Sequence, residues 1–233
     1  MISENIKKLK QAIQEKCIEC GRNSEEIKLI AVSKYFGTDS IIEAKNCGIE
    51  NFGENRAQEL TLKFDKLGDS VTWHFIGTLQ KNKVKYVVRC AEYIHSVDSL
   101  ALLYEINKKA ESIGKVQKIL FEVKTSEEET KSGVTSEEEV FKLAEEAKKL
   151  SNVKSIGLMT ISPLTEDEKL IRKSFSYLKN LKEKLNRNGF DFSELSMGMT
   201  SDFNIAIEEG STILRIGSAI FGERDYSKDW RQI

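Results

Sequence analysis

Two segments near the C-terminal end of the chain place glycine and hydroxyl side chains directly after short apolar runs. Residues 195–203 read LSMGMTSDF, and residues 215–224 read RIGSAIFGER. In both segments the start of a helix is expected to follow. Backbone N–H groups and the helix dipole attract anions at such a place, while glycine allows close approach and hydroxyls add hydrogen bonds. The pattern predicts a phosphate site, although a helix cap alone would explain Thr200 or Ser218 taken singly.

Lys34 stands at the end of the first apolar run, which reads KLIAVSK. An amine held at an apolar rim loses solvation, so that its pKa falls and the neutral form can attack an aldehyde to give a Schiff base. A solvated lysine at the end of a strand is the simpler interpretation. The residues of this segment leave both interpretations open.

Three further polar residues stand in or directly after apolar runs. Arg215 interrupts one of them, and a buried arginine needs a partner, which is either an acid of the core or an acceptor on a ligand. Asn55 either caps the helix that follows it or bonds to a ligand hydroxyl. We expect His74 to be a hydrogen-bonded core residue, and Gly53 to support a tight turn.

Eight short β-rich runs alternate with amphipathic helical segments that carry apolar residues at i, i+3 and i+4. Each crossover by a helix implies parallel pairing of the strands. The pattern predicts a single (β/α)8 barrel over about residues 27–224, preceded by a helix over about residues 2–20, with an open doubly wound sheet as the alternative. The runs are 27–33, 49–52, 71–76, 93–97, 116–123, 153–159, 194–197 and 212–216. Both folds gather functional residues at the carboxyl ends of the strands.

Composition excludes several classes of protein. Of the 233 residues, 36 are basic and 37 are acidic, which argues against a nucleic-acid-binding protein held by phosphate contacts alone. No run approaches the ~18 apolar residues of a membrane span, and the first residues lack the apolar core of a signal peptide. We therefore expect a cytoplasmic protein without nucleic-acid or membrane partners.

The chain offers no obvious domain boundary. Pro163 is the single proline, and no Gly/Ser-rich linker occurs, so we expect one domain over residues 1–233. No exposed apolar stripe is evident, and a monomer is expected. Cys17 and Cys20 form a CxxC pair without two further ligands at matching spacing, so no metal is expected and the four cysteines are expected to be buried, reduced thiols.

Taken together, the motifs resemble those of the pyridoxal phosphate homeostasis protein family over about residues 27–224. They are AVSK, FGENRAQE, HFIGTLQKNK, ETKSGV, IGLMT, LSMGMTSDF and RIGSAIFGER, in this order. The resemblance implies the barrel of the alanine racemase N-terminal domain without a second domain. It also implies a protein that binds pyridoxal 5′-phosphate (PLP) without established catalytic turnover, buffering it or delivering it to PLP-dependent apo-enzymes to keep vitamin B6 in balance.

The same resemblance implies roles for individual residues. Lys34 would hold PLP as a Schiff base, Arg215 would lie against the pyridine nitrogen, and Asn55 would lie near the ring. The phosphate contacts it implies are Ser196, Gly198, Thr200, Gly217 and Ser218.

The loop around residue 130 departs from the family pattern. Lys131 matches a family lysine with a suspected role in cofactor transfer, but Lys124 stands where asparagine is usual and Glu127 where glycine is usual. Thr200 replaces the usual serine and keeps the hydroxyl. The two charged replacements leave a ring-side role of that loop in question.

Two enzymatic alternatives remain beside the non-catalytic binder. A small PLP-dependent racemase needs a second acid or base on the opposite face of the ring, which alanine racemase takes from a second domain. Only residues 225–233 follow the last motif, and Tyr35 would point away from Lys34 if the strand continued. The other alternative is a Schiff-base aldolase acting on phosphorylated sugars. We therefore expect a binder rather than an enzyme.

Overall fold

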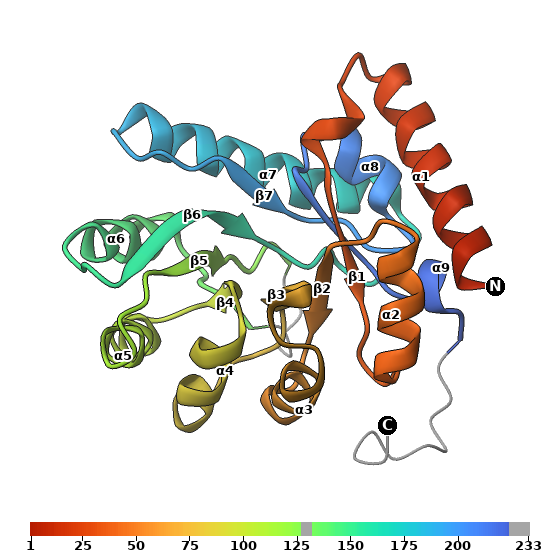
Figure 1. Cartoon of the computed structure of the whole chain (residues 1–233). Coiled ribbons are helices and arrows are strands. Elements are labelled where there is room, and N and C mark those ends of the chain that lie inside the picture. The colour runs from red at the N-terminus through yellow and green to blue at the C-terminus, as the bar shows by residue number, and fades with distance from the viewer. Residues whose placement is uncertain (127–131, 224–233) are drawn as a thin grey trace.

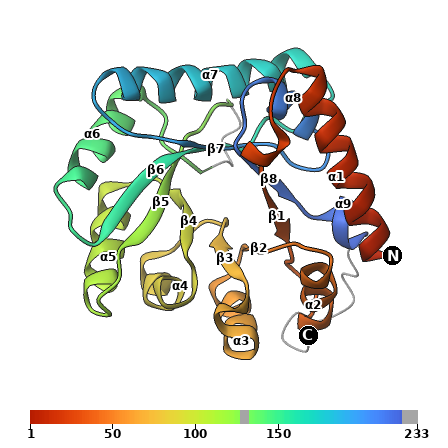
Figure 2. The same cartoon turned by 45° about the horizontal axis from the view of Figure 1, so that its top comes forward.

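Eight parallel strands close into a barrel in the order in which they occur along the chain (Figures 1 and 2). The computed structural model describes residues 1–126 and 132–223. The barrel closes because β8 pairs with β1 in parallel, with Ile30 opposite Arg215. The predicted (β/α)8 barrel is confirmed, and the open doubly wound sheet is excluded.

The strands are short, as expected for a barrel of this size. They are β1 (Lys28–Val32), β2 (Asn51–Glu54), β3 (Thr72–Phe75), β4 (Tyr93–Val97), β5 (Gln117–Glu122), β6 (Val153–Met159), β7 (Glu194–Ser196) and β8 (Ile213–Ile216). The α-helices form a ring outside the strands (Figure 2). They are α1 (Ile2–Glu19), α2 (Thr38–Asn46), α3 (Ala57–Leu67), α4 (Val84–Cys90), α5 (Leu100–Glu111), α6 (Glu137–Lys148), α7 (Glu168–Arg187), α8 (Phe203–Glu208) and α9 (Ser218–Phe221).

Strand β2 begins two residues later than the expected run 49–52. Ile49 belongs to the turn that ends α2, because its N–H donates to the carbonyl of Ala44 at 3.2 Å. Gly53 lies within β2 rather than in the expected tight turn. A Cβ atom there would lie 2.9 Å from Cγ2 of Ile30 and 3.1 Å from Cδ1 of Ile76, so glycine is needed at this position by packing inside the barrel.

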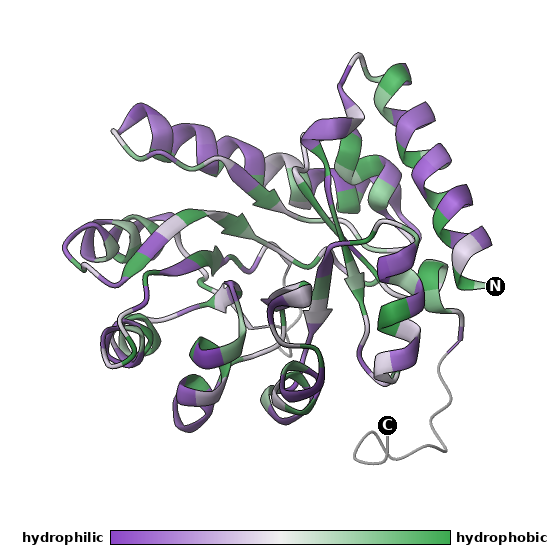
Figure 3. Ribbon diagram, viewed as in Figure 1, coloured by the Kyte–Doolittle hydropathy of each residue, from purple (hydrophilic) through white to green (hydrophobic). Residues whose placement is uncertain are grey.

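Apolar side chains fill the layer between the strands and the helices, as the green inner faces of the helices in Figure 3 show. A smaller apolar cluster lies inside the barrel. It consists of Ile30, Leu120, Ile156, Met159 and Ile213. Polar side chains are also buried there, namely His74, His95, Ser196 and Arg215. The interior of the barrel therefore contains both apolar and polar side chains.

Helix α1 packs against α8 and α9, the two short helices that follow the last strands (Figure 1). Its buried face consists of Ile6, Leu9, Ile13 and Cys17. Asn5 donates to the carbonyl of Ile220 at 3.0 Å, and Arg22 donates to the carbonyls of Ile207 and Ser211 at 2.7 and 2.8 Å. Helix α1 and the turn after it thus hold the two short helices that begin in the segments expected to bind an anion.

The four cysteines are free thiols. Cys17 and Cys90 are buried, but Cys20 and Cys47 are only half-buried, so burial holds for two of the four. Within residues 1–126 and 132–223, no group of three His, Cys, Asp or Glu side chains could hold a metal ion. None of the helices in those ranges is both long and apolar enough to cross a bilayer.

Candidate functional site

A cavity of about 350 Å³ opens at the carboxyl ends of the strands. Six of the eight residues expected to form the site line it, namely Lys34, Asn55, Thr200, Arg215, Gly217 and Ser218. The residues that complete its wall are Val32, Ile76, Ile161, Met199 and Ser201. A volume of this size is typical of small-molecule sites, and its place is where barrels of this type carry function.

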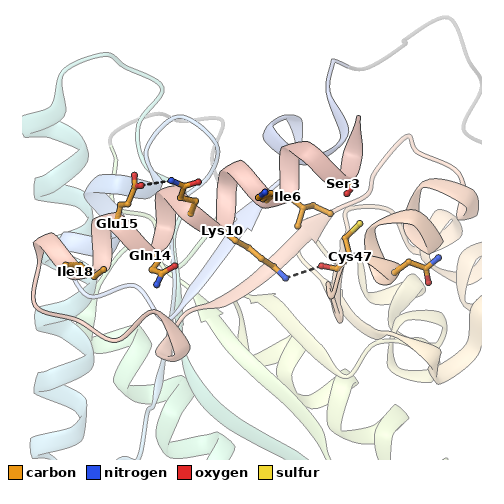
Figure 4. Close-up of a pocket in the computed structure, with 10 residues that line it drawn as sticks. Ser3, Ile6, Lys10, Gln14, Glu15, Ile18 and Cys47 are labelled. Carbon is orange, nitrogen blue, oxygen red and sulfur yellow. Dashed lines mark hydrogen bonds between the residues drawn. The ribbon is translucent and has the colours of Figure 1, made fainter.

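A larger groove of about 850 Å³ lies on the outside of the barrel along α1 (Figure 4). Lys10 crosses it and donates to the carbonyls of Cys47 and Gly48 at 3.2 and 3.1 Å. The remaining lining residues are mostly polar side chains of the helix surface. This groove gathers no set of groups that could do chemistry, so the candidate site is the smaller cavity at the strand ends.

Arg215 brings a positive charge into the barrel, where Asp202 and Glu122 act on it only through space. It is 5% exposed, and it donates to Oγ of Ser196 at 2.7 Å and to the carbonyl of Thr160 at 2.8 Å. No salt bridge of Arg215 occurs among the residues that the structure describes, so an ion pair with a core acid is not its role. Burial lowers its pKa to about 10, which leaves it charged at neutral pH. A guanidinium has five N–H donors, and further ones remain for an acceptor in the cavity.

Ser196 links Arg215 to a pair of buried histidines. Nδ1 of His95 lies 2.9 Å from Oγ of Ser196, and Nε2 of His95 lies 3.0 Å from Nδ1 of His74. Nε2 of His74 lies 3.1 Å from Oδ1 of Asn51 at the start of β2. Burial, together with nearby positive charges, holds the pKa of both imidazoles well below the usual range, so both are neutral.

These contacts assign one tautomer to each ring. Oδ1 of Asn51 can only accept, so Nε2 of His74 donates and its Nδ1 must accept. Nε2 of His95 therefore donates, its Nδ1 accepts, and the hydroxyl of Ser196 donates to it. The lone pairs of Ser196 then face Arg215, so the whole chain of hydrogen bonds runs away from the guanidinium and stabilises its charge.

The loops after β7 and β8 meet at a pair of hydroxyls. Oγ of Ser218 lies 3.2 Å from Oγ1 of Thr200, with Ser218 donating. Neither residue caps a helix, because Gly217 and Asp202 hold the N-cap positions of α9 and α8 without side-chain bonds to them. The cap explanation for these hydroxyls is therefore wrong. The first N–H groups of α9 have no acceptor within the helix.

Ser196 and Gly198 do not line the cavity. Ser196 is fully buried beneath Arg215. Gly198 has φ of +97°, and a Cβ atom there would lie 2.6 Å from Cβ of Ala206 and 2.8 Å from Cδ2 of Leu214. This glycine is required by the tight packing of the loop against α8 and β8.

Asn55 lines the cavity without capping α3, whose N-cap is Arg56. Its Oδ1 is buried and has no hydrogen-bond partner within the described ranges. Buried acceptors are almost always paired, so a donor from a ligand is expected there. The cap interpretation of Asn55 is wrong.

Sequence reasoning missed the apolar wall of the cavity and part of the loop after β7. Ile76 directly follows β3, Ile161 is the second residue after β6, and Met199 and Ser201 flank Thr200. Their positions shortly after the ends of strands were the available signal. Lys131 and Glu127 lie outside the described residues. Lys124 is half-buried, and its N–H donates to the carbonyl of Val134 at 2.9 Å.

Comparison with known proteins places this geometry in a family. Residues 2–225 match the alanine racemase N-terminal domain. The chain is 44% identical over 225 residues to a pyridoxal phosphate homeostasis protein of Aquifex aeolicus (strain VF5), covering 96% of this chain and 98% of the relative. It is 39% identical over 231 residues to the protein of the same name from Vibrio alginolyticus, covering 97% and 99%.

Comparison with solved structures leads to the same family. PipY of Synechococcus elongatus PCC7942, solved with PLP bound, superposes with a TM-score of 0.84 at 32% identity, covering 95% of this chain and 100% of PipY. An alanine racemase of Clostridium difficile 630 shares only the fold, with a TM-score of 0.75 at 15% identity over 94% of this chain and 60% of the racemase. Full-length relatives at this identity confirm the resemblance of the motifs, and the chain belongs to the pyridoxal phosphate homeostasis protein family.

Proposed function

We propose that this chain binds PLP in the cavity at the strand ends and serves PLP homeostasis without catalytic turnover. The observation that carries this proposal is the convergence of three features in one cavity. These are the amine of Lys34, the guanidinium of Arg215 without a carboxylate partner among the described residues, and the hydroxyl pair of Thr200 and Ser218. Relatives bear the name of this role, and PipY has been solved with PLP bound.

The residues present fit the chemical groups of PLP. Lys34 offers an amine to the aldehyde, and Arg215 offers N–H donors to the ring nitrogen. Thr200, Gly217 and Ser218 surround the place for the phosphate with hydroxyls and helix N–H groups. The buried Oδ1 of Asn55 can accept a hydrogen bond, and the ring hydroxyl of PLP is the candidate donor.

Ser196 and Gly198 take indirect roles in this proposal. Ser196 accepts from Arg215 and, through His95, keeps the guanidinium fixed. Gly198 lets the loop after β7 pack closely enough to present Thr200 to the cavity. Both were expected to contact the phosphate, and both are now proposed to support residues that contact the ligand.

The residues around the cavity favour storage over turnover. When bound, PLP supplies an aldehyde and an electron-withdrawing ring. Arg215 disfavours a proton on the ring nitrogen, because two positive charges would then meet, and this weakens electron withdrawal. In the described part of the chain, no carboxylate, imidazole, phenol or thiol lines the cavity, so a second acid or base for racemization is not provided there.

Binding and linkage to Lys34 can be tested together. Purified protein mixed with PLP should develop a visible absorbance band, and borohydride should supply the hydride that makes the link permanent. Peptide mass spectrometry should then find the pyridoxyl group on Lys34, and Lys34→Ala should lose both the band and the adduct. An adduct on another lysine would overturn the assignment of Lys34.

The same preparation separates the enzymatic alternatives. A racemase would interconvert the enantiomers of an amino acid faster than free PLP does, and Lys34→Ala would abolish this. An aldolase would form a borohydride adduct with a sugar phosphate in PLP-free protein. We expect neither result.

Delivery to other proteins is part of the proposal. Incubation of the loaded protein with a PLP-dependent apo-enzyme should restore that enzyme's activity. Direct transfer predicts restoration even in the presence of an excess of a hydrazine, which traps free PLP by condensing with its aldehyde. Restoration abolished by the trap would indicate release into solution.

A further inference from the structure

Three charged side chains lie outside the barrel wall, directly behind Lys34. Glu54 ends β2, and Glu59 and Lys63 lie one turn apart on α3. Their exposed fractions are 0%, 2% and 4%. Because successive residues of a strand point to opposite sides, Ser33 faces this cluster while Lys34 lines the cavity.

All three N–H donors of Lys63 are used, two by the carboxylates of the cluster and one by the backbone of β1. Its Nζ donates to Oε1 of Glu54 at 2.6 Å, to Oε1 of Glu59 at 2.8 Å and to the carbonyl of Ser33 at 2.8 Å. Oε1 of Glu54 also accepts from the hydroxyl of Ser33 at 2.6 Å. The end of β1 is therefore tied to β2 and to α3 by charged hydrogen bonds, which are stronger than neutral ones.

The cluster holds the peptide groups on both sides of Lys34. The carbonyl of Ser33, which Lys63 binds, belongs to the peptide bond before Lys34. The N–H of Tyr35, which belongs to the peptide bond after Lys34, donates to Oε1 of Glu59 at 2.6 Å. Fixing both peptide planes fixes the backbone angles of the residue between them, and these set the direction in which its side chain leaves the backbone.

The turn around Lys34 would not hold this shape by its own preference. The N–H of Phe36 donates to the carbonyl of Ser33 at 3.0 Å, and Tyr35 has φ of +70°. Positive φ at the third position of such a turn favours glycine, and a tyrosine there is strained. The contact of Tyr35 with Glu59 helps to keep the strained geometry.

The cluster is costly as a purely structural element. Two carboxylates share one ammonium, and Oε2 of Glu54 and of Glu59 have no hydrogen-bond partner within residues 1–126 and 132–223. Burial, with the nearby charge of Glu59, raises the pKa of Glu54 to about 7 against the opposing effect of Lys63. Well-packed apolar residues often stabilise a protein as well as a buried ion cluster does.

We propose that Glu54, Glu59 and Lys63 form a positioning cluster that fixes the backbone on both sides of Lys34 and so aims its amine into the cavity. The proposal rests on the proposed function, because it concerns the amine that meets the aldehyde of PLP. The cluster touches no ligand itself. Its effect is therefore confined to ligands that react with Lys34.

The test compares PLP with an analogue of the same ring and phosphate that carries a methyl group in place of the aldehyde. Glu59→Ala removes the acceptor of the Tyr35 N–H, whereas Glu59→Gln keeps an oxygen there. We expect Glu59→Ala to weaken PLP binding at least about tenfold, which corresponds to about 1.4 kcal/mol, with analogue binding unchanged. Glu59→Gln should retain most of the affinity for both ligands.

A matched control is available at the opposite end of the barrel. Glu194 pairs with Lys28 at 3.3 Å and accepts from Thr212 at 2.6 Å, so Glu194→Ala also removes a partly buried carboxylate. It should leave both affinities unchanged. If Glu59→Ala fails to give the wild-type circular dichroism spectrum, Ser33→Ala takes its place and should weaken PLP binding selectively.

The outcomes separate the two proposals. Equal loss of both ligands in Glu59→Ala, equal PLP loss in Glu59→Gln, or no loss of PLP binding in a folded cluster variant would overturn the positioning role. Failure of the wild-type protein to bind PLP would instead overturn the proposed function.

Discussion

Arg215 and the two histidines behind it show how single residues set the electrostatics of the cavity. The guanidinium is charged, and the imidazoles of His95 and His74 are held neutral by burial. Ser196 joins the two parts by accepting from Arg215 and lying 2.9 Å from Nδ1 of His95. Arg215 thus presents a positive charge to the cavity, while the two imidazoles behind it add none.

The tautomers can be observed directly, because the chain contains only two histidines. Nitrogen NMR of the labelled protein should show both rings neutral and protonated at Nε2. Their pKa values lie well below the usual range, so no titration is expected between about pH 6 and 8, around the ordinary value of about 6.5. Asn51→Asp should raise the pKa of His74, and protonation at Nδ1 in the wild type would contradict the assignment.

The hydroxyl pair makes a second prediction for single residues. Thr200→Val and Ser218→Ala should each lower the affinity for PLP about 10–100-fold, since a hydrogen bond to a charged group such as the phosphate contributes about 1.5–3 kcal/mol. Thr200→Ser keeps the hydroxyl and should bind nearly as well as the wild type. Ser112→Ala, far from the cavity on the surface, is the control for fluorescence titrations. Unchanged affinity in both variants would exclude these residues from the proposed phosphate site.

At the scale of elements, the loop between β7 and α8 depends on close packing. Gly198 combines φ of +97° with a missing Cβ that would clash with Ala206 and Leu214. Asp202 braces the same loop, because its Oδ1 accepts from the N–H of Met199 at 2.6 Å. The loop is thus held as a rigid edge of the cavity.

Gly198→Ala should therefore lower the free energy of unfolding by more than backbone strain alone would. Gly189 is the matched control, because its φ is +81° and a Cβ there would meet nothing within 4 Å. We expect Gly189→Ala to cost about 1 kcal/mol. Gly198→Ala should cost about 1–3 kcal/mol more through overpacking, and should weaken PLP binding. Equal values of the two changes in urea denaturation would show that the clash is relieved without cost.

At the scale of the whole molecule, the polar interior makes stability depend on pH. Glu122 is 6% exposed at the end of β5, and burial with the nearby charge of Asp98 raises its pKa to about 7 despite the attraction of Arg215. An acid whose pKa is raised by folding binds more protons in the folded state. Its contribution to stability is therefore largest at low pH and is lost as pH rises toward 7.

Glu122→Gln removes this dependence. Relative to the wild type, the variant should gain stability between about pH 5 and 8, by up to about 3 kcal/mol at the upper end. Denaturation of both proteins at several pH values measures the difference. A constant difference across this range would mean that Glu122 titrates at its ordinary pKa in the folded protein.

The sequence by itself predicted the fold, the family and most of the residues that line the cavity. The alternation of eight apolar runs with amphipathic segments predicted the barrel, because strands and helices differ in the period of their apolar faces. The motifs around Lys34, Thr200 and Ser218 identified the family and the residues that gather in the cavity. These features depend on residues that are close to one another in the sequence, so they can be recognised without knowledge of the fold.

Only the tertiary structure decided which polar groups meet. Ser196 was expected at the phosphate, but strand register buries it between Arg215 and His95. The cluster behind Lys34 was not foreseen either, because it joins a strand end to one face of α3. Contacts between elements depend on how strands and helices pack in three dimensions, and the periodicity of a sequence carries no record of that.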